Sequence, residues 1–146
     1  MSFISFISSV LSIPLVPGSV FPLQFGVAGT NYVGPDYSAG QLGGKINAVD
    51  PLPSPTNAVD EAAMRHDIAN HYADSSATPN MDTLRADAQF LTDLTGLLQA
   101  DEMPPEETTL AEVALDVFIV KTVIGLSAAI HEAYEIISTQ WDASIV

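Results

Sequence analysis

Proline and glycine gather in one stretch of this chain, and their distribution constrains the fold more than any other feature. Residues 14–56 hold seven of the ten prolines and seven of the nine glycines in the chain. Proline lacks a backbone N–H and glycine loses the most conformational freedom on folding, so both interrupt helices and strands. We therefore expect loops over this stretch, with a short strand near Val20–Phe25, and the helices after it.

The residues after this stretch carry the signals of three helices. Asn57 is a favourable N-cap and predicts a helix from there to about Ala73. Apolar side chains recur at helical spacing from about Met81 to Ala100, and a long apolar helix is expected from Thr108 to about Thr139. Residues 101–107 contain two consecutive prolines and are expected to connect these two helices. The fold class is predicted to be mainly α.

The first residues of the chain are apolar and follow a helical pattern that Pro14 would end. We expect this short helix to pack on the core or on a partner; the alternative is an uncharged helix that lies in a membrane surface. No Lys or Arg occurs before Lys45, so no signal peptide is predicted, and the prolines argue against a transmembrane segment. The apolar residues of this pattern are Phe3, Phe6, Ile7, Val10 and Leu11.

Length and charge narrow the class of protein. A chain of 146 residues fits one domain, which we divide into an apolar segment (1–29), a core (30–100) and a linker with the last helix (101–146). The formal net charge is −14, which argues against nucleic acid as a partner because phosphate binding needs clustered cations. The chain has no cysteine, which excludes disulfides and thiolate zinc sites and favours an intracellular or particle-borne protein.

A histidine and a carboxylate fall on the apolar faces of the first two predicted helices. His66 shares a face with Val59 and Ala62, and Asp87 lies between Leu84 and Leu91 on the next helix. A carboxylate is costly to bury unless it is paired, so His66 is a natural partner for Asp87. A carboxylate on one imidazole nitrogen leaves the other free to act as a general base. On this pattern alone, such a pair is more often structural than catalytic.

Three blocks of sequence then suggest a family. They are Asn-Tyr-Val-Gly-Pro at 31–35, Pro-Thr-Asn-Ala-Val-Asp-Glu-Ala-Ala-Met-Arg-His-Asp at 55–67, and Ala-Asp-Ala-Gln-Phe at 86–90. In this order they resemble the phospholipase A2 domain of parvovirus minor capsid proteins, over roughly residues 30 to 95. The resemblance implies a calcium loop followed by two antiparallel catalytic helices. Members of that family also lack the disulfides of secreted phospholipases.

The resemblance implies a role for individual residues. His66 matches the general base that activates a water for attack on the sn-2 ester, and Asp87 matches the carboxylate that orients it. Asn70 stands where the family has tyrosine, and it is expected to support the orienting carboxylate by a hydrogen bond. The implied calcium ligands are the Asp67 side chain and the backbone carbonyls of Tyr32, Gly34 and Asp36, with Asp36 standing where the family has a second glycine.

The predicted last helix is apolar nearly all round from Val113 to Ile137. Such a helix is expected to be buried on several sides, one against the catalytic helices and another against a partner. Asp116, Lys121 and His131 interrupt it, so a membrane span is not expected, and we expect His131 at the surface.

The resemblance implies a calcium-dependent phospholipase A2 that acts on phospholipid membranes. In that family the enzyme is carried by the virion and breaches a host membrane during entry. The competing interpretation is a catalytically weak structural subunit that binds a capsid or another protein partner through its apolar ends. A third is a carrier of a membrane-active N-terminal segment.

Overall fold

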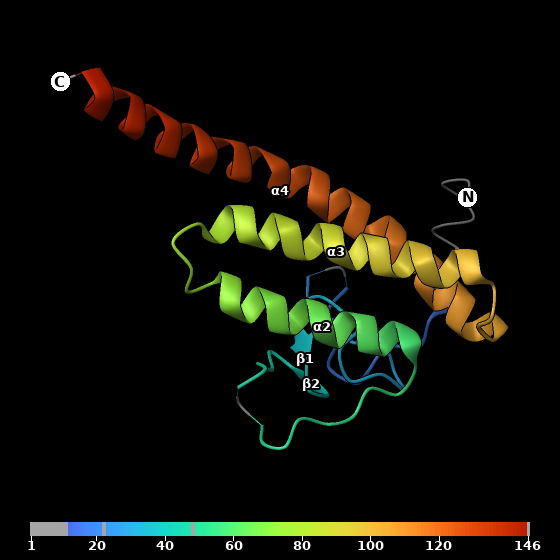
Figure 1. Ribbon diagram of the computed structural model, residues 1–146. Helices are drawn as coiled ribbons and strands as arrows, with labels where there is room; N and C mark the ends of the chain where they lie inside the picture. Colours follow the sequence, from blue (N-terminus) through green and yellow to red (C-terminus); the bar gives the residue numbers. More distant parts are fainter. Residues whose placement is uncertain (1–11, 22, 48, 146) are drawn as a thin grey trace.

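The computed structural model describes residues 12–21, 23–47 and 49–145. The predicted N-terminal helix lies outside these residues. A loop region is followed by three helices, α2 (Ala58–Ala73), α3 (Pro79–Ala100) and α4 (Pro105–Ile145) (Figure 1). The mainly α fold class with a long C-terminal helix is therefore confirmed.

The three predicted helices are all present, and two of them are longer than expected. The Asn57 side chain caps α2 by accepting a hydrogen bond from the Asp60 N–H at 2.8 Å. α3 begins two residues early because Pro79 fits the first position of a helix, where no N–H is needed. α4 likewise begins at Pro105, so the connection between α3 and α4 is shorter than predicted.

The strand predicted near Val20–Phe25 is wrong. Val20 and Gln24 form an isolated bridge that closes a tight turn, and the described residues around it form no strand beyond a second isolated bridge between Leu15 and Val27. The strands of the described residues lie further on, at β1 (Tyr37–Ser38) and β2 (Gln41–Leu42), which pair antiparallel. Ala39 and Gly40 both have positive φ, as a two-residue hairpin turn requires.

α2 and α3 run antiparallel side by side, α4 lies along α3, and the loop region covers the other side of α2 (Figure 1). The core forms where the loops meet the helices. Buried side chains come from the loop region and from all three helices, among them Val27, Val59, Phe90, Leu94 and Ala111. The division of the chain at residues 29 and 100 stays a prediction, although all three stretches contribute to this core.

α4 is held at several points along its first two thirds. Its Glu132 carboxylate accepts hydrogen bonds from the N–H groups of Asn80 and Met81, each at 2.9 Å. These N–H groups lie in the first turn of α3, where they have no partner within the helix. Glu132 therefore caps α3 from a neighbouring helix, a role that Thr78 does not fill with its side chain.

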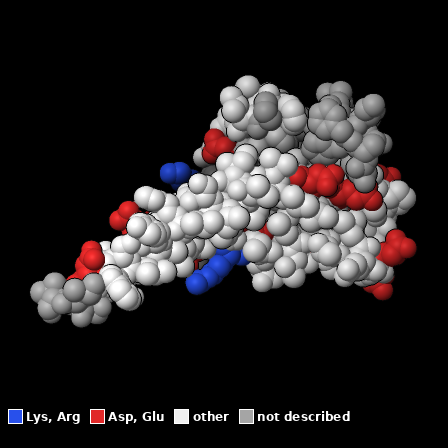
Figure 2. Space-filling model, turned by 90° about the horizontal axis from the view of Figure 1, so that it is seen from above, with Lys and Arg blue, Asp and Glu red and all other residues white. Residues whose placement is uncertain are grey.

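The expectation that α4 is buried on several sides is wrong for its C-terminal part. The helix extends past the N-terminal end of α3 (Figure 1), and the face seen in Figure 2 is mostly uncharged. The described chain is too short to surround a helix of 41 residues. By length and composition Pro105–Asp142 could also cross a membrane, which is weak support for a span. The exposed large apolar residues of α4 are Ile119, Val120, Val123, Ile124, Leu126, Ile130, Tyr134, Ile136, Ile137 and Trp141.

Candidate active site

The structure brings together His66 of α2 and Asp87 of α3, as predicted. The distance from His66 Nε2 to Asp87 Oδ1 is 2.6 Å, and both side chains are buried. An ionised carboxylate can only accept a hydrogen bond, so Nε2 carries the hydrogen and donates it to Asp87. The other ring nitrogen, Nδ1, is then unprotonated in the neutral ring. This is the nitrogen that could take a proton from a water.

Two aromatic rings hold the imidazole of His66 in place. Phe90 of α3 stacks on it with ring centroids 5.0 Å apart, and Phe118 of α4 meets it edge-on at 4.9 Å. The two phenylalanines also contact each other edge-on at 4.6 Å. Rings packed on two sides leave the imidazole little freedom to rotate, so its two nitrogens keep fixed directions.

Lys121 of α4 completes the surroundings of Asp87, a contact that the sequence did not predict. Its Nζ lies 2.7 Å from Oδ1 and 2.9 Å from Oδ2 of Asp87. Burial raises the pKa of Asp87, but the hydrogen bonds from His66 and Lys121 outweigh burial and hold it below its ordinary value. The signal available in the sequence was a lysine three residues after Phe118 on the same helical face.

Asp67 lies on the other side of His66. Its Oδ1 is 3.7 Å from His66 Nδ1, and its Oδ2 accepts a hydrogen bond from the Ser38 hydroxyl at 2.7 Å. Burial raises the pKa of Asp67 above its ordinary value, and the contacts with His66 and Ser38 only partly offset it. Asp67 is therefore a largely buried carboxylate with no Lys or Arg against it in the described part of the chain.

The two carboxylates also act on His66 itself. Burial lowers the pKa of His66, but contact with Asp67 and Asp87 raises it, and the net pKa lies above the ordinary value. Lys121 opposes this rise because it places positive charge near the ring.

The loop before α2 is tied to the helix by a buried carboxylate, Asp60, which the sequence pattern did not single out. Its oxygens accept hydrogen bonds from the N–H groups of Asn31, Tyr32 and Thr56, at 2.8–3.1 Å. The Tyr32 side chain is itself buried, and its hydroxyl donates to the Pro53 carbonyl. The loop is thus fixed one and a half turns before His66 on α2.

Gly34 and Asp36 stand at special backbone positions in this loop. Gly34 has φ +147°, and a Cβ there would collide with the Phe25 carbonyl oxygen. Asp36 has φ +51°, a left-handed conformation that glycine favours and aspartate tolerates better than most residues. The Asp36 side chain turns to Gln24 Nε2, at 2.5 Å. Both residues line an open cleft of about 510 Å³, together with Asp67, Asn70 and Ser38.

The oxygen groups of this cleft, and of Tyr32 two residues before Gly34, are candidate ligands for a calcium ion. Asp67 offers a carboxylate that lacks a cation, and no described donor bonds the carbonyl oxygens of Tyr32 or Gly34. The Asp36 carbonyl accepts from the Gly43 N–H at 2.7 Å and keeps one lone pair. Calcium prefers such hard oxygen ligands. Within the described residues no group of three or more His, Cys, Asp or Glu side chains could hold a metal, so the candidate site depends on one carboxylate and backbone carbonyls.

Asn70 lies one turn after His66, and it contacts the ring. Its Nδ2 is 3.2 Å from His66 Nε2, while no hydrogen bond between Asn70 and Asp87 is found among the described residues. Its Oδ1 is buried without a described partner. Asn70 was predicted to support the orienting carboxylate, but Lys121 makes that contact instead.

His131 is exposed as expected, and its Nε2 lies 3.6 Å from Glu135 Oε1.

Comparison with known families supports the resemblance that the three sequence blocks indicated. The model of a family described as phospholipase A2-like domain matches residues 24–121. The match is longer than the resemblance seen over residues 30 to 95, and it takes in the first part of α4 as far as Lys121. Comparison with curated proteins and with solved structures gave no match. Since the matched residues make up more than half of the chain, it belongs to the phospholipase A2-like domain family.

Proposed function

We propose that the chain is a calcium-dependent phospholipase A2 that hydrolyses the sn-2 ester of phospholipids. One observation carries this proposal: the ring of His66 lies between a charge-balanced carboxylate at Nε2 and an unbalanced carboxylate near Nδ1. The first arrangement suits orientation of a general base. The second suits a cation beside the nitrogen that would receive the proton.

The proposed roles follow from these contacts. His66 Nδ1 takes a proton from a water as that water attacks the ester carbonyl. The Nε2–H bond to Asp87 fixes the tautomer and stabilises the imidazolium that forms. The protonated ring then returns its proton to the leaving glycerol oxygen. Family membership supports this assignment of roles, and the geometry fits it.

The proposed calcium site would use the Asp67 carboxylate and the backbone carbonyls of Tyr32, Gly34 and Asp36. Bound calcium would supply a Lewis acid for the ester carbonyl and positive charge for the phosphate. Asp67 is held for this role by the Ser38 hydroxyl, and the loop by Asp60. These bonds hold the Asp67 carboxylate and the start of the loop at Asn31 and Tyr32.

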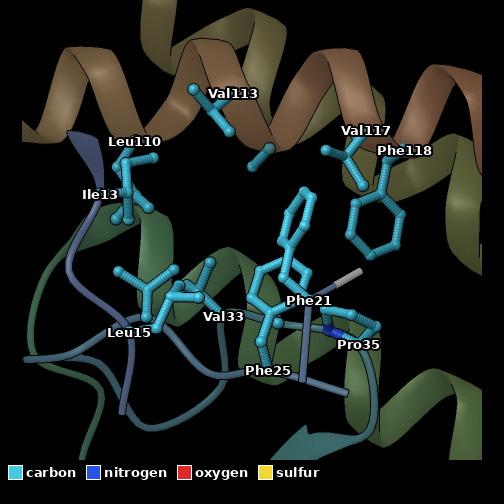
Figure 3. Close-up of a pocket in the computed structure, with 13 residues that line it drawn as sticks. Ile13, Leu15, Phe21, Phe25, Val33, Pro35, Leu110, Val113, Val117 and Phe118 are labelled. Atoms are coloured by element: carbon cyan, nitrogen blue, oxygen red, sulfur yellow. The ribbon is translucent and has the colours of Figure 1, made fainter. Parts of the chain in front are cut away.

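A narrow apolar pocket beside the site would accept part of a fatty acyl chain. It lies between the loop region and α4, and its side chains point toward one another across the gap (Figure 3). Gly34 lines both this pocket and the polar cleft, and Phe118 joins the pocket to His66. In a phospholipid the ester lies between an apolar acyl chain and a charged headgroup. This order matches the apolar pocket, His66 and the polar cleft. The labelled residues are Ile13, Leu15, Phe21, Phe25, Val33, Pro35, Leu110, Val113, Val117 and Phe118.

The biological setting is proposed from the resemblance to parvovirus minor capsid proteins. A virion-borne enzyme of this kind would breach a host membrane during entry. The net charge of −14 supports an apolar rather than an electrostatic approach to lipid.

The test is release of fatty acid from phosphatidylcholine vesicles labelled separately at sn-1 and sn-2. We expect sn-2 release that requires calcium and stops with a chelator. His66→Ala should lower the rate by about 10²–10⁴-fold, because a positioned base is lost. His131→Ala removes an exposed histidine and is the matched control, expected to keep the parental rate. Release from sn-1, or release that the chelator and His66→Ala leave unchanged, would refute the proposal.

The alternative function is a structural subunit that binds a capsid or another protein partner. The exposed apolar part of α4 supports it, because a face of this kind often marks an interaction site. Val123→Ser with Ile130→Ser should then weaken association measured by sedimentation while the helical signal in circular dichroism persists. A folded parent chain that lacks sn-2 hydrolysis, combined with this loss of association, would favour the structural function.

A further inference from the structure

Lys121 bonds the buried carboxylate that faces the proposed general base. Its ammonium contacts both oxygens of Asp87, at 2.7 and 2.9 Å, while Oδ1 also accepts the His66 Nε2–H at 2.6 Å. The Asp87 side chain is 4% exposed, whereas that of Lys121 is 45% exposed. The lysine therefore extends from the surface of α4 to a carboxylate that solvent scarcely reaches.

Contact with both oxygens determines how the carboxylate is oriented. A carboxylate held by a single hydrogen bond can rotate about its Cβ–Cγ bond, and the ring that it holds can move with it. The ammonium fixes the second oxygen and so restricts this rotation. Asn70, the residue expected to do this, lies instead beside the ring nitrogen.

α4 supplies Lys121 together with a second contact on the same ring. Phe118, one turn earlier, packs edge-on against His66, and the Lys121 ammonium lies 5.3 Å from the centre of the Phe118 ring. Residues three apart on a helix share a face, so α4 presents both side chains to the α2–α3 pair.

We propose that Lys121 is a positioning residue of the active site, which holds both oxygens of Asp87 so that this carboxylate keeps His66 oriented. This inference rests on the proposed hydrolase function and adds α4 to the catalytic unit. The active site would then draw on all three helices.

The test compares Lys121→Met, which keeps the length of the side chain, with Lys121→Arg, which keeps the charge. We expect Lys121→Met to lower kcat on a monomeric short-chain phospholipid by about 10–100-fold with little change in KM, as for loss of other supporting groups. Lys121→Arg should recover most of this loss. Arg85→Met removes an exposed cation of α3 and is the control, expected to match the parent.

A second readout works even if the chain proves inactive. Carbon-13 NMR of the Asp87 carboxyl should show its pKa rising in Lys121→Met and staying low in Lys121→Arg. An inactive parent chain with this pattern would refute the proposed function and leave the Lys121–Asp87 contact established. Unchanged kcat in Lys121→Met would overturn the positioning role. Equal loss of kcat in both variants, with the Asp87 pKa unchanged, would also overturn it and leave Lys121 as a structural anchor.

Discussion

The two sides of His66 differ in how they balance charge. On the Nε2 side, Asp87 of α3 is buried, and Lys121 of α4 bonds both of its oxygens. On the Nδ1 side, Asp67 faces an open cleft, and its one described hydrogen bond comes from the neutral Ser38 hydroxyl. The same residue type is thus charge-balanced in one place and unbalanced in the other.

This difference indicates which carboxylate is built for a fixed partner and which for an exchangeable one. The pKa of Asp87 is lowered because protein donors outweigh its burial, whereas the pKa of Asp67 is raised because burial outweighs its donors. A buried charge without an opposite charge costs stability unless a ligand supplies that charge. We interpret the Asp67 side as the place where calcium would compensate the carboxylate.

The largest expected effect on stability separates the two carboxylates directly. Asp87→Asn should lower the free energy of unfolding at pH 7 by about 1–3 kcal/mol, since His66 and Lys121 lose their charged acceptor. Asp67→Asn should change it by less than about 1 kcal/mol in a chelator, because the amide still accepts from Ser38 and a buried charge is removed. Urea denaturation followed by circular dichroism measures both. Equal destabilisation by the two substitutions would contradict the comparison.

A smaller effect is expected in the pH dependence of stability. The pKa of Asp87 is below its ordinary value of 3.8 in the folded chain, so its contribution to stability is complete above that value and is lost as the pH falls through the folded pKa. The pKa of Asp67 is raised in the folded chain, so in a chelator its contribution is lost as the pH rises from 3.8 through the folded pKa.

Urea denaturation from pH 3 to pH 7 in chelator, with the Asn variant of each carboxylate, measures this contrast. The free energy of unfolding of Asp87→Asn should lie furthest below that of the parent at neutral pH and approach it as the pH falls. The free energy of unfolding of Asp67→Asn should increase relative to that of the parent as the pH rises. Parallel curves for all three chains would mean that neither carboxylate has the environment assigned to it.

Much of the fold and the centre of the site could be predicted because they depend on local signals. Asn57 marks the start of α2, and apolar spacing predicted α3 and α4 within a few residues of their observed starts at Pro79 and Pro105. The contact between His66 and Asp87 was predicted from helical spacing together with the cost of an unpaired carboxylate. These signals need only the neighbouring residues along the chain.

Other features depend on packing between distant segments, and the spacing of apolar residues along the chain does not predict such packing. Lys121 is 34 residues from Asp87, and the sequence indicated only that it interrupts an apolar helix, not which residue it contacts. Periodicity likewise shows that α4 is apolar but does not show how much of it the rest of the chain covers. The short strand was misplaced because Val20 and Gln24 form only an isolated bridge around a tight turn, and the flanking residues add one further isolated bridge, between Leu15 and Val27.

Calcium titration by calorimetry tests the difference between the two sides of His66 most directly. We expect the parent chain and Asp87→Asn to bind one calcium ion with similar affinity, because Asp87 lies on the side already balanced by Lys121. Asp67→Asn should bind calcium far more weakly, because the one carboxylate among the proposed ligands is lost. Equal calcium affinity in the parent and Asp67→Asn, or no binding by the parent, would contradict the account.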